Sequence, residues 1–299
     1  MRVVAITGPT AAGKSAVSIA LAHALDAEVI NCDSMQLYKG MDIGTAKLTP
    51  AEREGVPHHL LDIWPVTQPA SVAEYQTLAR KAIDEICARG RRPMLVGGSG
   101  LYLRAALEDF AFPGTDPVVR AELEGQLAAT SPQDMWERLR TLDPEAAARI
   151  LPTNGRRIVR ALEVIELTGR PFMAALPSPT PVYPATVLAI DREDLDLRVA
   201  QRVSHMWELG FVEEVRALEA QGLRDGLTAS RALGYQQVLT HLAGDCSEEE
   251  AFAATVQGTR RFVRRQRSWL RRDGSIVWLD GAARDLARQA REIIDRGDM

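Results

Sequence analysis

An eight-residue segment near the N-terminus combines glycines, a lysine and a serine in a spacing suited to binding phosphate. It follows the apolar run of residues 3–6 and precedes a segment with helical apolar spacing. Backbone N–H groups of such a loop can point at an anion, and the following helix adds the positive end of its dipole. A glycine-rich turn without a ligand is the alternative, which both flanks disfavour. We predict a P-loop that binds a phosphorylated compound through Gly8, Pro9, Thr10, Ala11, Ala12, Gly13, Lys14 and Ser15.

Three side chains in or near this loop could act on a phosphorylated ligand. Lys14 supplies an ammonium group, and the Ser15 hydroxyl can ligate Mg²⁺. Asp33 follows the second predicted strand, and ligands of open α/β sheets bind beyond the carboxyl ends of the strands. Its carboxylate could accept a proton or help to hold Mg²⁺, and the alternative is that it caps the next helix or turn.

Two further polar features could complete this site. Ser99 lies in a glycine-rich segment, residues 97–100, where it could bind a phosphate or a base unless the segment is only a tight turn. Arg198 and Arg202 are four residues apart on a predicted helix and therefore share a face. A pair of arginines can stabilise a departing diphosphate, although ion pairs with neighbouring aspartates are the alternative.

An arginine-rich run occupies residues 260–272, where seven of thirteen positions are arginine. So many like charges repel one another unless an anion is near, which favours a polyanionic partner over a solvated helix face. The adjacent His58 and His59 lack further ligands at zinc spacing, and we predict a structural role for them.

The elements that position these residues follow an alternating pattern at first. Strands separated by helices predict a parallel sheet with right-handed crossovers. A stretch of helices without strands then interrupts the pattern. Strands are predicted at 2–7, 27–32, 93–96, 185–190 and 276–279, and helices at 15–25, 72–89, 117–129, 133–141, 145–151, 156–168, 195–209, 212–221, 235–242, 248–271 and from 282. Asp116 and Ser131 precede prolines and are predicted N-caps, and residues 171–184 contain five prolines and are predicted to form a linker.

Composition excludes several classes of protein. The 299 residues are 46% hydrophobic and 25% charged, as in ordinary globular proteins, and carry a net charge of −4, unlike a generally basic nucleic-acid binder. Three scattered cysteines suggest neither a zinc site nor disulfides. Neither a signal peptide nor an apolar stretch of membrane-spanning length is recognisable, so we expect a cytoplasmic location and no membrane contact. The GTPase sequence N-K-x-D is absent.

Taken together, the motifs of this chain resemble those of the tRNA dimethylallyltransferase family, and in the absence of a zinc finger its bacterial form. The resemblance covers nearly the whole chain. It rests on the P-loop 8–15, Asp-Ser-Met-Gln at 33–36, Asp-Ile-Gly-Thr-Ala-Lys at 42–47, Pro-His-His-Leu at 57–60, Gly-Gly-Ser-Gly-Leu-Tyr at 97–102, Arg-Ile-Val-Arg-Ala-Leu-Glu-Val at 157–164, Gly-Tyr at 234–235 and Arg-Gln-Arg-Ser-Trp at 265–269.

The resemblance implies transfer of a dimethylallyl group from dimethylallyl diphosphate to N6 of the adenosine 3′-adjacent to the anticodon in tRNA, with release of diphosphate. It implies a P-loop NTPase-like core of residues 1–113 and 185–299, a helical insertion of residues 114–184 that contacts the anticodon stem, and Mg²⁺ as cofactor. Catalytic roles fall to Lys14, Asp33, Arg198 and Arg202, with Ser15 at the metal; we expect a monomer. The tRNA-binding positions implied are Asp33, Ser34, Met35, Gln36, Ser99, Arg120, Arg156, Arg157, Ile158, Val159, Arg160, Arg231, Gly234, Tyr235, Gln236, Arg260, Arg261, Arg264, Arg265 and Gln266.

Two other functions share part of this pattern. A small-molecule kinase would have the same core up to about residue 100, but would not explain the helical insertion or the arginine-rich run. An RNA-binding protein with a vestigial P-loop would explain the arginines, but not the intact Lys14, Ser15 and Asp33. Consumption of ATP would favour the first, and RNA binding without prenyl transfer the second.

Overall fold

The computed structural model describes residues 1–110, 112–172 and 180–298, which form two compact units. The α/β unit consists of Met1–Leu107 and Val182–Met299, and the helical unit of Glu108–Pro181. Among the residues that are described, no helix has both the length and the apolar character that crossing a bilayer requires. Each unit has its own core, so each is described by itself.

A parallel sheet forms the centre of the α/β unit, as the alternation of strands and helices predicted. Its buried middle strand, β1, pairs with β4 on one side and β5 on the other. Such strands are covered on both faces, which explains the unbroken apolar run of β1. In the described residues the order is β3 (His58–His59), β2 (Ala27–Asn31), β4 (Arg92–Val96), β1 (Val3–Thr7), β5 (Ala185–Asp191) and β6 (Val277–Asp280).

The short edge strand β3 contains the histidine pair for which the sequence predicted a structural role. The imidazole Nε2 of His59 lies 2.6 Å from a carboxylate oxygen of the buried Glu28 on β2. Arg89 also donates to Glu28, and these bonds hold the pKa of its carboxyl below the usual value against the opposing effect of burial. The bond between His59 and Glu28 therefore holds the edge strand β3 against β2.

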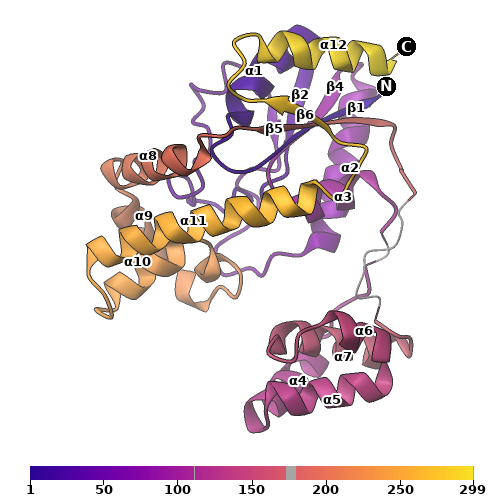
Figure 1. The fold of residues 1–299 in the computed structure, drawn as a ribbon, viewed down its shortest axis with the longest axis vertical. Helices are drawn as coiled ribbons and strands as arrows, with labels where there is room; N and C mark the ends of the chain where they lie inside the picture. The colour runs from indigo at the N-terminus through magenta and orange to yellow at the C-terminus, as the bar shows by residue number, and fades with distance from the viewer. Residues whose placement is uncertain (111, 173–179, 299) are drawn as a thin grey trace. The chain divides into compact units, whose positions relative to one another are not determined.

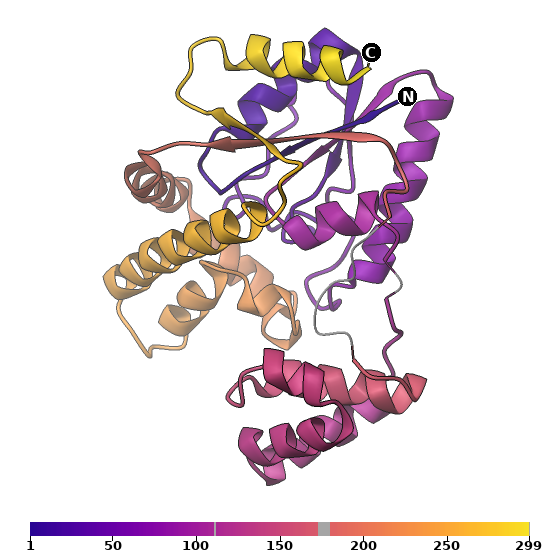
Figure 2. The ribbon, with the colours of Figure 1, turned by 45° about the vertical axis from the view of Figure 1, so that its right-hand side comes forward.

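Helices cover both faces of this sheet (Figures 1 and 2). On one face lie α1 (Lys14–Leu25) and α12 (Leu286–Asp298), and on the other α2 (Val72–Ala88) and α3 (Gly100–Leu107). Further along the chain follow α8 (Leu195–Glu208), α9 (Phe211–Glu219), η1 (Leu223–Asp225), η2 (Ala229–Arg231), α10 (Tyr235–Leu242) and α11 (Glu248–Leu270). The long α11 packs against α8 and α10, so the arginine-rich run belongs to the α/β unit.

The helical unit contains α4 (Pro117–Ala129), α5 (Pro132–Leu142), α6 (Pro144–Arg149) and α7 (Gly155–Thr168). Both predicted N-caps are confirmed, since the side chain of Asp116 accepts from the N–H of Val118 and Ser131 forms a capping box with Asp134. Apolar side chains of these helices form a separate core. Residues 173–179 of the predicted linker lie outside the described residues.

Candidate active site

The P-loop joins β1 to α1, and its side chains and backbone already contact one another. The ammonium of Lys14 donates to the carbonyl oxygens of Gly8 at 3.0 Å and Pro9 at 2.8 Å. Arg198 of α8 donates from Nε to the carbonyl of Ala11 at 2.8 Å. Helix α1 begins at Lys14, so its N-terminal dipole faces the loop. The loop thus carries two cations at the place where an anion would bind.

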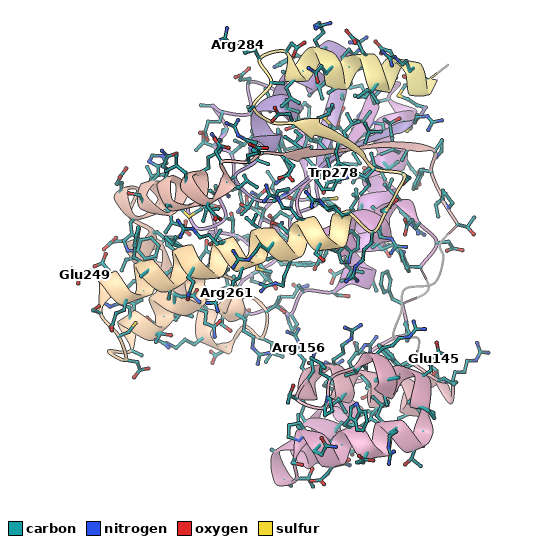
Figure 3. All side chains as sticks on the ribbon, in the orientation of Figure 1. Glu145, Arg156, Glu249, Arg261, Trp278 and Arg284 are labelled. Carbon is teal, nitrogen blue, oxygen red and sulfur yellow. The ribbon has the colours of Figure 1, made fainter. Side chains whose placement is uncertain are left out.

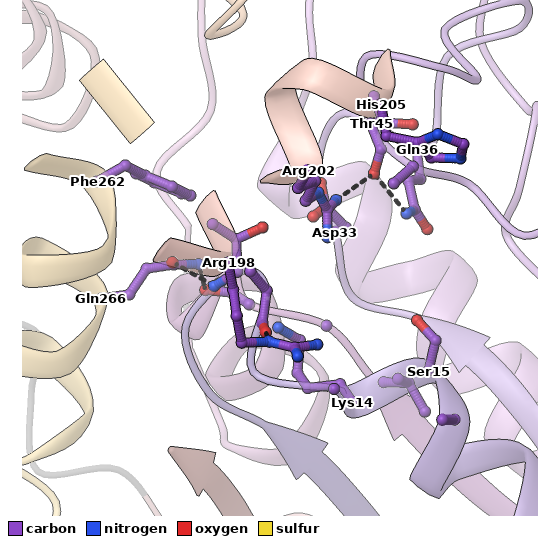
Figure 4. A pocket seen from close by; sticks show the side chains of 18 of the residues that line it. Lys14, Ser15, Asp33, Gln36, Thr45, Arg198, Arg202, His205, Phe262 and Gln266 are labelled. Atoms are coloured by element: carbon purple, nitrogen blue, oxygen red, sulfur yellow. Dashed lines mark hydrogen bonds between the residues drawn. The ribbon is translucent and has the colours of Figure 1, made fainter. Parts of the chain in front are cut away.

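A pocket of about 430 Å³ opens over this loop (Figure 4). Thr10, Ala11, Gly13, Lys14 and Ser15 line it together with the other predicted catalytic residues, Asp33, Arg198 and Arg202. The structure therefore brings together the four side chains to which the sequence assigned catalysis. Lining residues that sequence reasoning did not single out for the site are Ala16, Thr45, Ala46, Val96, Gln201, His205 and Phe262.

Asp33 is held at the end of β2 by its own backbone. Its N–H donates to the side-chain oxygen of Asn31 at 2.8 Å, and its carbonyl accepts from the amide nitrogen of Asn31 at 3.0 Å. The carboxylate oxygen Oδ1 accepts from the N–H of Met35 at 2.9 Å. These bonds fix the direction of a carboxylate that lines the pocket, which is what a group placed to accept a proton requires.

Burial disfavours the charged forms of two cations in the pocket, Lys14 and Arg202. Burial and the neighbouring charge of Arg202 lower the pKa of Lys14 to about 8, and the charge of Asp33 acts in the opposite direction. Burial also lowers the pKa of Arg202, again opposed by Asp33. An anion bound between these cations would relieve their repulsion, so the pocket is suited to a multiply charged phosphate group.

Two hydrogen bonds hold residues that were predicted to bind tRNA next to Asp33. The N–H of Ser34 donates to Oγ of Ser99 at 3.4 Å, which joins the loops after β2 and β4. Gln36 lines the pocket and donates to the carbonyl of Thr45 at 3.2 Å. Ser34, Ser99 and Met35 are half-buried beside the pocket, and their predicted contacts with RNA stay predictions.

Gln266 of α11, for which contact with tRNA is predicted, also connects two loops of the pocket. It is 8% exposed, and its side chain accepts from the N–H of Thr10 and donates to the carbonyl of Gly98, both at 3.0 Å. The next turn of α11 places Trp269 against Gly100, where a Cβ atom would lie 2.0 Å from the indole. The amide of Gln266 therefore joins the P-loop to the glycine-rich loop, and its contact with RNA stays a prediction.

Other predicted RNA contacts are also buried. Tyr235 is 1% exposed and donates its hydroxyl to Glu214 at 2.6 Å, and Gly234 is buried beside it. Ile158 and Val159 of α7 lie in the core of the helical unit, at 0% and 1% exposure. The side chains of Tyr235, Ile158 and Val159 pack inside the protein, and the contacts with RNA predicted at these positions stay predictions. Their motifs combine packing residues with exposed ones, which the sequence alone does not separate.

The arginines of the helical unit also fall into two groups. Arg120 and Arg160 both pair with the fully buried carboxylate of Glu163. Burial raises the pKa of Glu163, but the hydrogen bonds and charges of the two arginines hold it below its usual value. Arg156 and Arg157 at the start of α7 are instead exposed (Figure 3 labels Arg156). The first pair stabilises the unit, and the second is accessible to a partner.

Helix α11 presents most of its arginines to solvent. Arg261, Arg264 and Arg265 are exposed and line an open groove of about 440 Å³ with Ser268, Trp269 and Arg272 (Figure 3 labels Arg261). Arg260 differs, since it donates to the backbone carbonyl of Asp196 at 3.2 Å. Arg231 and Gln236 are exposed on η2 and α10. The exposed arginine face is an accessible surface for a polyanion.

Comparison with known proteins identifies relatives over the whole chain. The family model described as IPP transferase matches residues 36–273. A tRNA dimethylallyltransferase of Salinispora arenicola is 68% identical over 96% of this chain and 85% of its own length. One of Streptomyces avermitilis is 64% identical over 95% of this chain and 92% of its own length.

Two solved structures also resemble this chain. A tRNA isopentenylpyrophosphate transferase of Bacillus halodurans has a TM-score of 0.71 at 39% identity, over 99% of this chain and 94% of that one. A eukaryotic dimethylallyltransferase described as acting on tRNA has a TM-score of 0.83 at 27% identity, over 99% and 79% of the two chains. Because the family model spans most of the sequence and these relatives align with nearly all of it, the chain belongs to the IPP transferase family.

Proposed function

We propose that the protein transfers the dimethylallyl group of dimethylallyl diphosphate to N6 of the adenosine 3′-adjacent to the anticodon in tRNA, releasing diphosphate. One observation carries the proposal: a single pocket is lined by a phosphate-binding loop, two arginines and one carboxylate. These groups are what a reaction needs that expels diphosphate and removes a proton from its nucleophile. The family and the names of its members support the same reaction.

The P-loop end of the pocket binds the diphosphate. Lys14, Arg198 and Arg202 surround the position that the P-loop backbone prepares for an anion. As the bond between C1 of the prenyl group and oxygen breaks, its electron pair passes to the diphosphate, and these three cations stabilise the negative charge.

A Mg²⁺ ion fits this end of the pocket by the chemistry of its donors. No cluster of three or more His, Cys, Asp or Glu that could hold a metal occurs in the described parts of the chain. Mg²⁺ that accompanies a phosphorylated substrate needs only one or two protein oxygens, because substrate oxygens and water complete the shell. The hydroxyl of Ser15, which lines the pocket, would supply such an oxygen, and the ion would add positive charge beside the diphosphate.

Asp33 serves the opposite end of the reaction. The exocyclic nitrogen of adenine forms a bond to C1 of the prenyl group and must lose one proton. The carboxylate of Asp33, fixed by Asn31 and Met35, accepts that proton as the bond forms. The base reaches the pocket only when it leaves the stack of its RNA loop. Gln36 and Thr45, which line the pocket with Asp33, would contact the adenine base.

RNA binding falls to the exposed basic surfaces. On α11 these are Arg261, Arg264 and Arg265, and on the helical unit Arg156 and Arg157. We assign the helical unit to the anticodon stem, because its exposed arginines occur in a motif that resembles one of the family. We further expect a monomer in the reducing cytoplasm, where Cys32, Cys87 and Cys246 stay thiols.

The test is an incubation of the full chain with prenyl-labelled dimethylallyl diphosphate, Mg²⁺ and an anticodon stem-loop that carries adenosine 3′ to the anticodon. Label should appear on the RNA together with one diphosphate per prenyl group. A stem-loop with purine in place of that adenine lacks the amino group and should remain unlabelled. Labelling of the purine control, or consumption of ATP with no labelled RNA, would refute the proposal.

The Asp33→Asn variant tests the proton acceptor in the same assay. Asparagine keeps an oxygen for the N–H of Met35 but is a far weaker base, so turnover should fall by ~10²-fold or more while the stem-loop still binds. Binding of the stem-loop is measured separately by fluorescence anisotropy. Normal turnover of this variant would remove Asp33 from the mechanism.

A further inference from the structure

Apart from the contact with adenine proposed for Thr45, a short segment of the pocket wall has no role in the reaction as described so far. We call residues 42–47, Asp-Ile-Gly-Thr-Ala-Lys, the wall loop. Thr45 and Ala46 of this loop line the pocket next to Asp33 and Gln36. The loop is neither helix nor strand, so its shape depends on the side chains that hold it.

One carboxylate outside the pocket holds most of the wall loop. Glu214 of α9 accepts at Oε2 from the N–H groups of Asp42 at 3.0 Å and Ile43 at 2.6 Å. At Oε1 it accepts from the N–H of Gly44 at 3.2 Å and from the hydroxyl of Tyr235 at 2.6 Å. Four donors thus converge on one side chain, and bonds to a charged acceptor are stronger than bonds between neutral groups.

Packing and a second charge fix the same loop. A Cβ atom at Gly44 would lie 2.2 Å from the ring of Phe211 and 2.6 Å from that of Tyr235, so the backbone rests directly on these rings. Lys47 is buried and donates to the carbonyl of Tyr38 at 2.9 Å and to the carboxylate of Asp42 at 2.5 Å. The loop is therefore held by contacts that lie outside the pocket.

The other end of this chain of contacts reaches the reacting groups. The carbonyl oxygen of Thr45 accepts from Nη2 of Arg202 at 3.1 Å and from Nε2 of Gln36 at 3.2 Å (Figure 4). Both donors line the pocket with Asp33, and Arg202 lies close enough for the charge of Asp33 to oppose the lowering of its pKa. A shift of Thr45 would therefore move Arg202, which we assign to the diphosphate, and Gln36, which we place beside the adenine.

We propose that Glu214 is a positioning residue for prenyl transfer, acting through the wall loop on Gln36 and Arg202. The inference rests on the proposed function, since it assigns Glu214 to the same pocket. Glu214 does not line the pocket, and its carboxylate is occupied by the three backbone N–H groups and the Tyr235 hydroxyl. It supplies the fixed geometry that a reaction between two bound substrates needs.

The first test compares Glu214→Gln with Glu213→Gln. In Glu214→Gln one oxygen becomes an NH₂ group, so at least one backbone N–H of the wall loop loses its acceptor and the loop must shift. Glu213 is the adjacent exposed residue, whose only described partner is Arg216 on its own helix. We expect Glu214→Gln to lower kcat by about 10- to 100-fold, the size of effect that small displacements of reacting groups produce. Glu213→Gln should leave kcat unchanged.

Binding of inorganic diphosphate distinguishes positioning from general damage. In Glu214→Gln only Arg202, one of the three cations assigned to the diphosphate, would shift, so the Kd for diphosphate should rise by about threefold, the worth of a single weak hydrogen bond, which is less than the fall in kcat. A loss of diphosphate-binding sites in proportion to the fall in kcat would mean loss of folded protein and would overturn the proposal. Should this variant not fold, Tyr235→Phe, which removes one hydroxyl donor and keeps the ring, must still lower kcat, and an unchanged kcat would overturn it.

A double-mutant cycle tests the route. If Glu214 acts through Thr45 on Gln36, then Glu214→Gln should add little to the loss of kcat already caused by Gln36→Ala. Full additivity of the two losses would refute this route. A wild-type protein that fails to label the stem-loop would instead refute the proposed function, so the two failures are distinguishable.

Discussion

At the scale of single residues, Lys14 shows how the pocket prepares for its ligand. Its ammonium donates to Gly8 and Pro9 of its own loop, and burial together with Arg202 lowers its pKa to about 8. The lysine is charged below that pH and loses its proton above it. A bound diphosphate favours the charged form, so binding above pH 8 must be accompanied by uptake of a proton.

This pKa predicts how diphosphate affinity depends on pH. The affinity for diphosphate should reach its maximum well below pH 8, where Lys14 is already charged. Above pH 8 it should fall by up to about tenfold per pH unit, because Lys14 must then take up a proton when diphosphate binds. Titration calorimetry with inorganic diphosphate between pH 6.5 and 9.5 measures the change. In Lys14→Arg the guanidinium stays charged, so the difference between the two proteins should vanish below pH 8 and grow above it. Equal pH profiles would contradict the role given to Lys14.

At the scale of elements, α11 has two faces with separate tasks. Its buried face carries Gln266, which bonds to the P-loop and the glycine-rich loop, and Trp269, which packs on Gly100. Its exposed face carries Arg261, Arg264 and Arg265. The sequence predicted the helix and its charge, since both follow from local composition. It did not predict the role of Gln266, because helical spacing does not say which loops lie opposite a buried face.

The exposed face predicts a change in the salt dependence of RNA binding. Replacing Arg261, Arg264 and Arg265 together by glutamine should weaken binding of the anticodon stem-loop and flatten the plot of log Kd against log salt, by about 0.7 for each phosphate that an arginine no longer neutralises. Anisotropy titrations at several salt concentrations measure the slope. A control with Arg288, Arg291 and Arg296 of α12 changed to glutamine alters net charge equally and should keep the parent slope. Equal slopes in both variants would place the α11 arginines away from RNA.

At the scale of the whole molecule, the described chain has separate cores in its two units. Leu139 is fully buried in the core of the helical unit. None of the residues of that core belongs to the two clusters that pack on the sheet. Damage to one core should therefore leave the other intact.

Leu139→Ala tests this independence. The cavity should destabilise the helical unit by about 2–5 kcal/mol and lower prenyl transfer to the stem-loop, while the Kd for inorganic diphosphate stays unchanged. Thermal unfolding followed by circular dichroism and a diphosphate titration measure the two effects. Leu142→Ala on the same helix is the matched control, since Leu142 is exposed and should change neither. Loss of diphosphate binding in Leu139→Ala would show that the two cores are coupled.

The sequence predicted the parallel sheet, the N-caps and the groups Lys14, Asp33, Arg198 and Arg202, because strand periodicity and the P-loop spacing are local signals. Pocket residues such as Thr45 and Phe262 come from distant segments, and only the tertiary fold places them there. Helical spacing also predicts Ala73, Leu78, Ala82 and Ile86 as inward positions on α2, which is confirmed for Ala82 and Ile86 and wrong for Ala73. Ala73 is exposed and Leu78 half-buried, since the buried stripe runs instead through Tyr75, Ala79, Ala82, Ile83 and Ile86.

The amide of Gln266 has one more consequence. It joins the anion-binding loop to the helix whose exposed arginines we propose to bind RNA, so a displacement of α11 by a docked anticodon arm would move Thr10 as well. Capture of one substrate and grip on the other would then be thermodynamically linked, and each would alter the affinity of its counterpart by an equal factor.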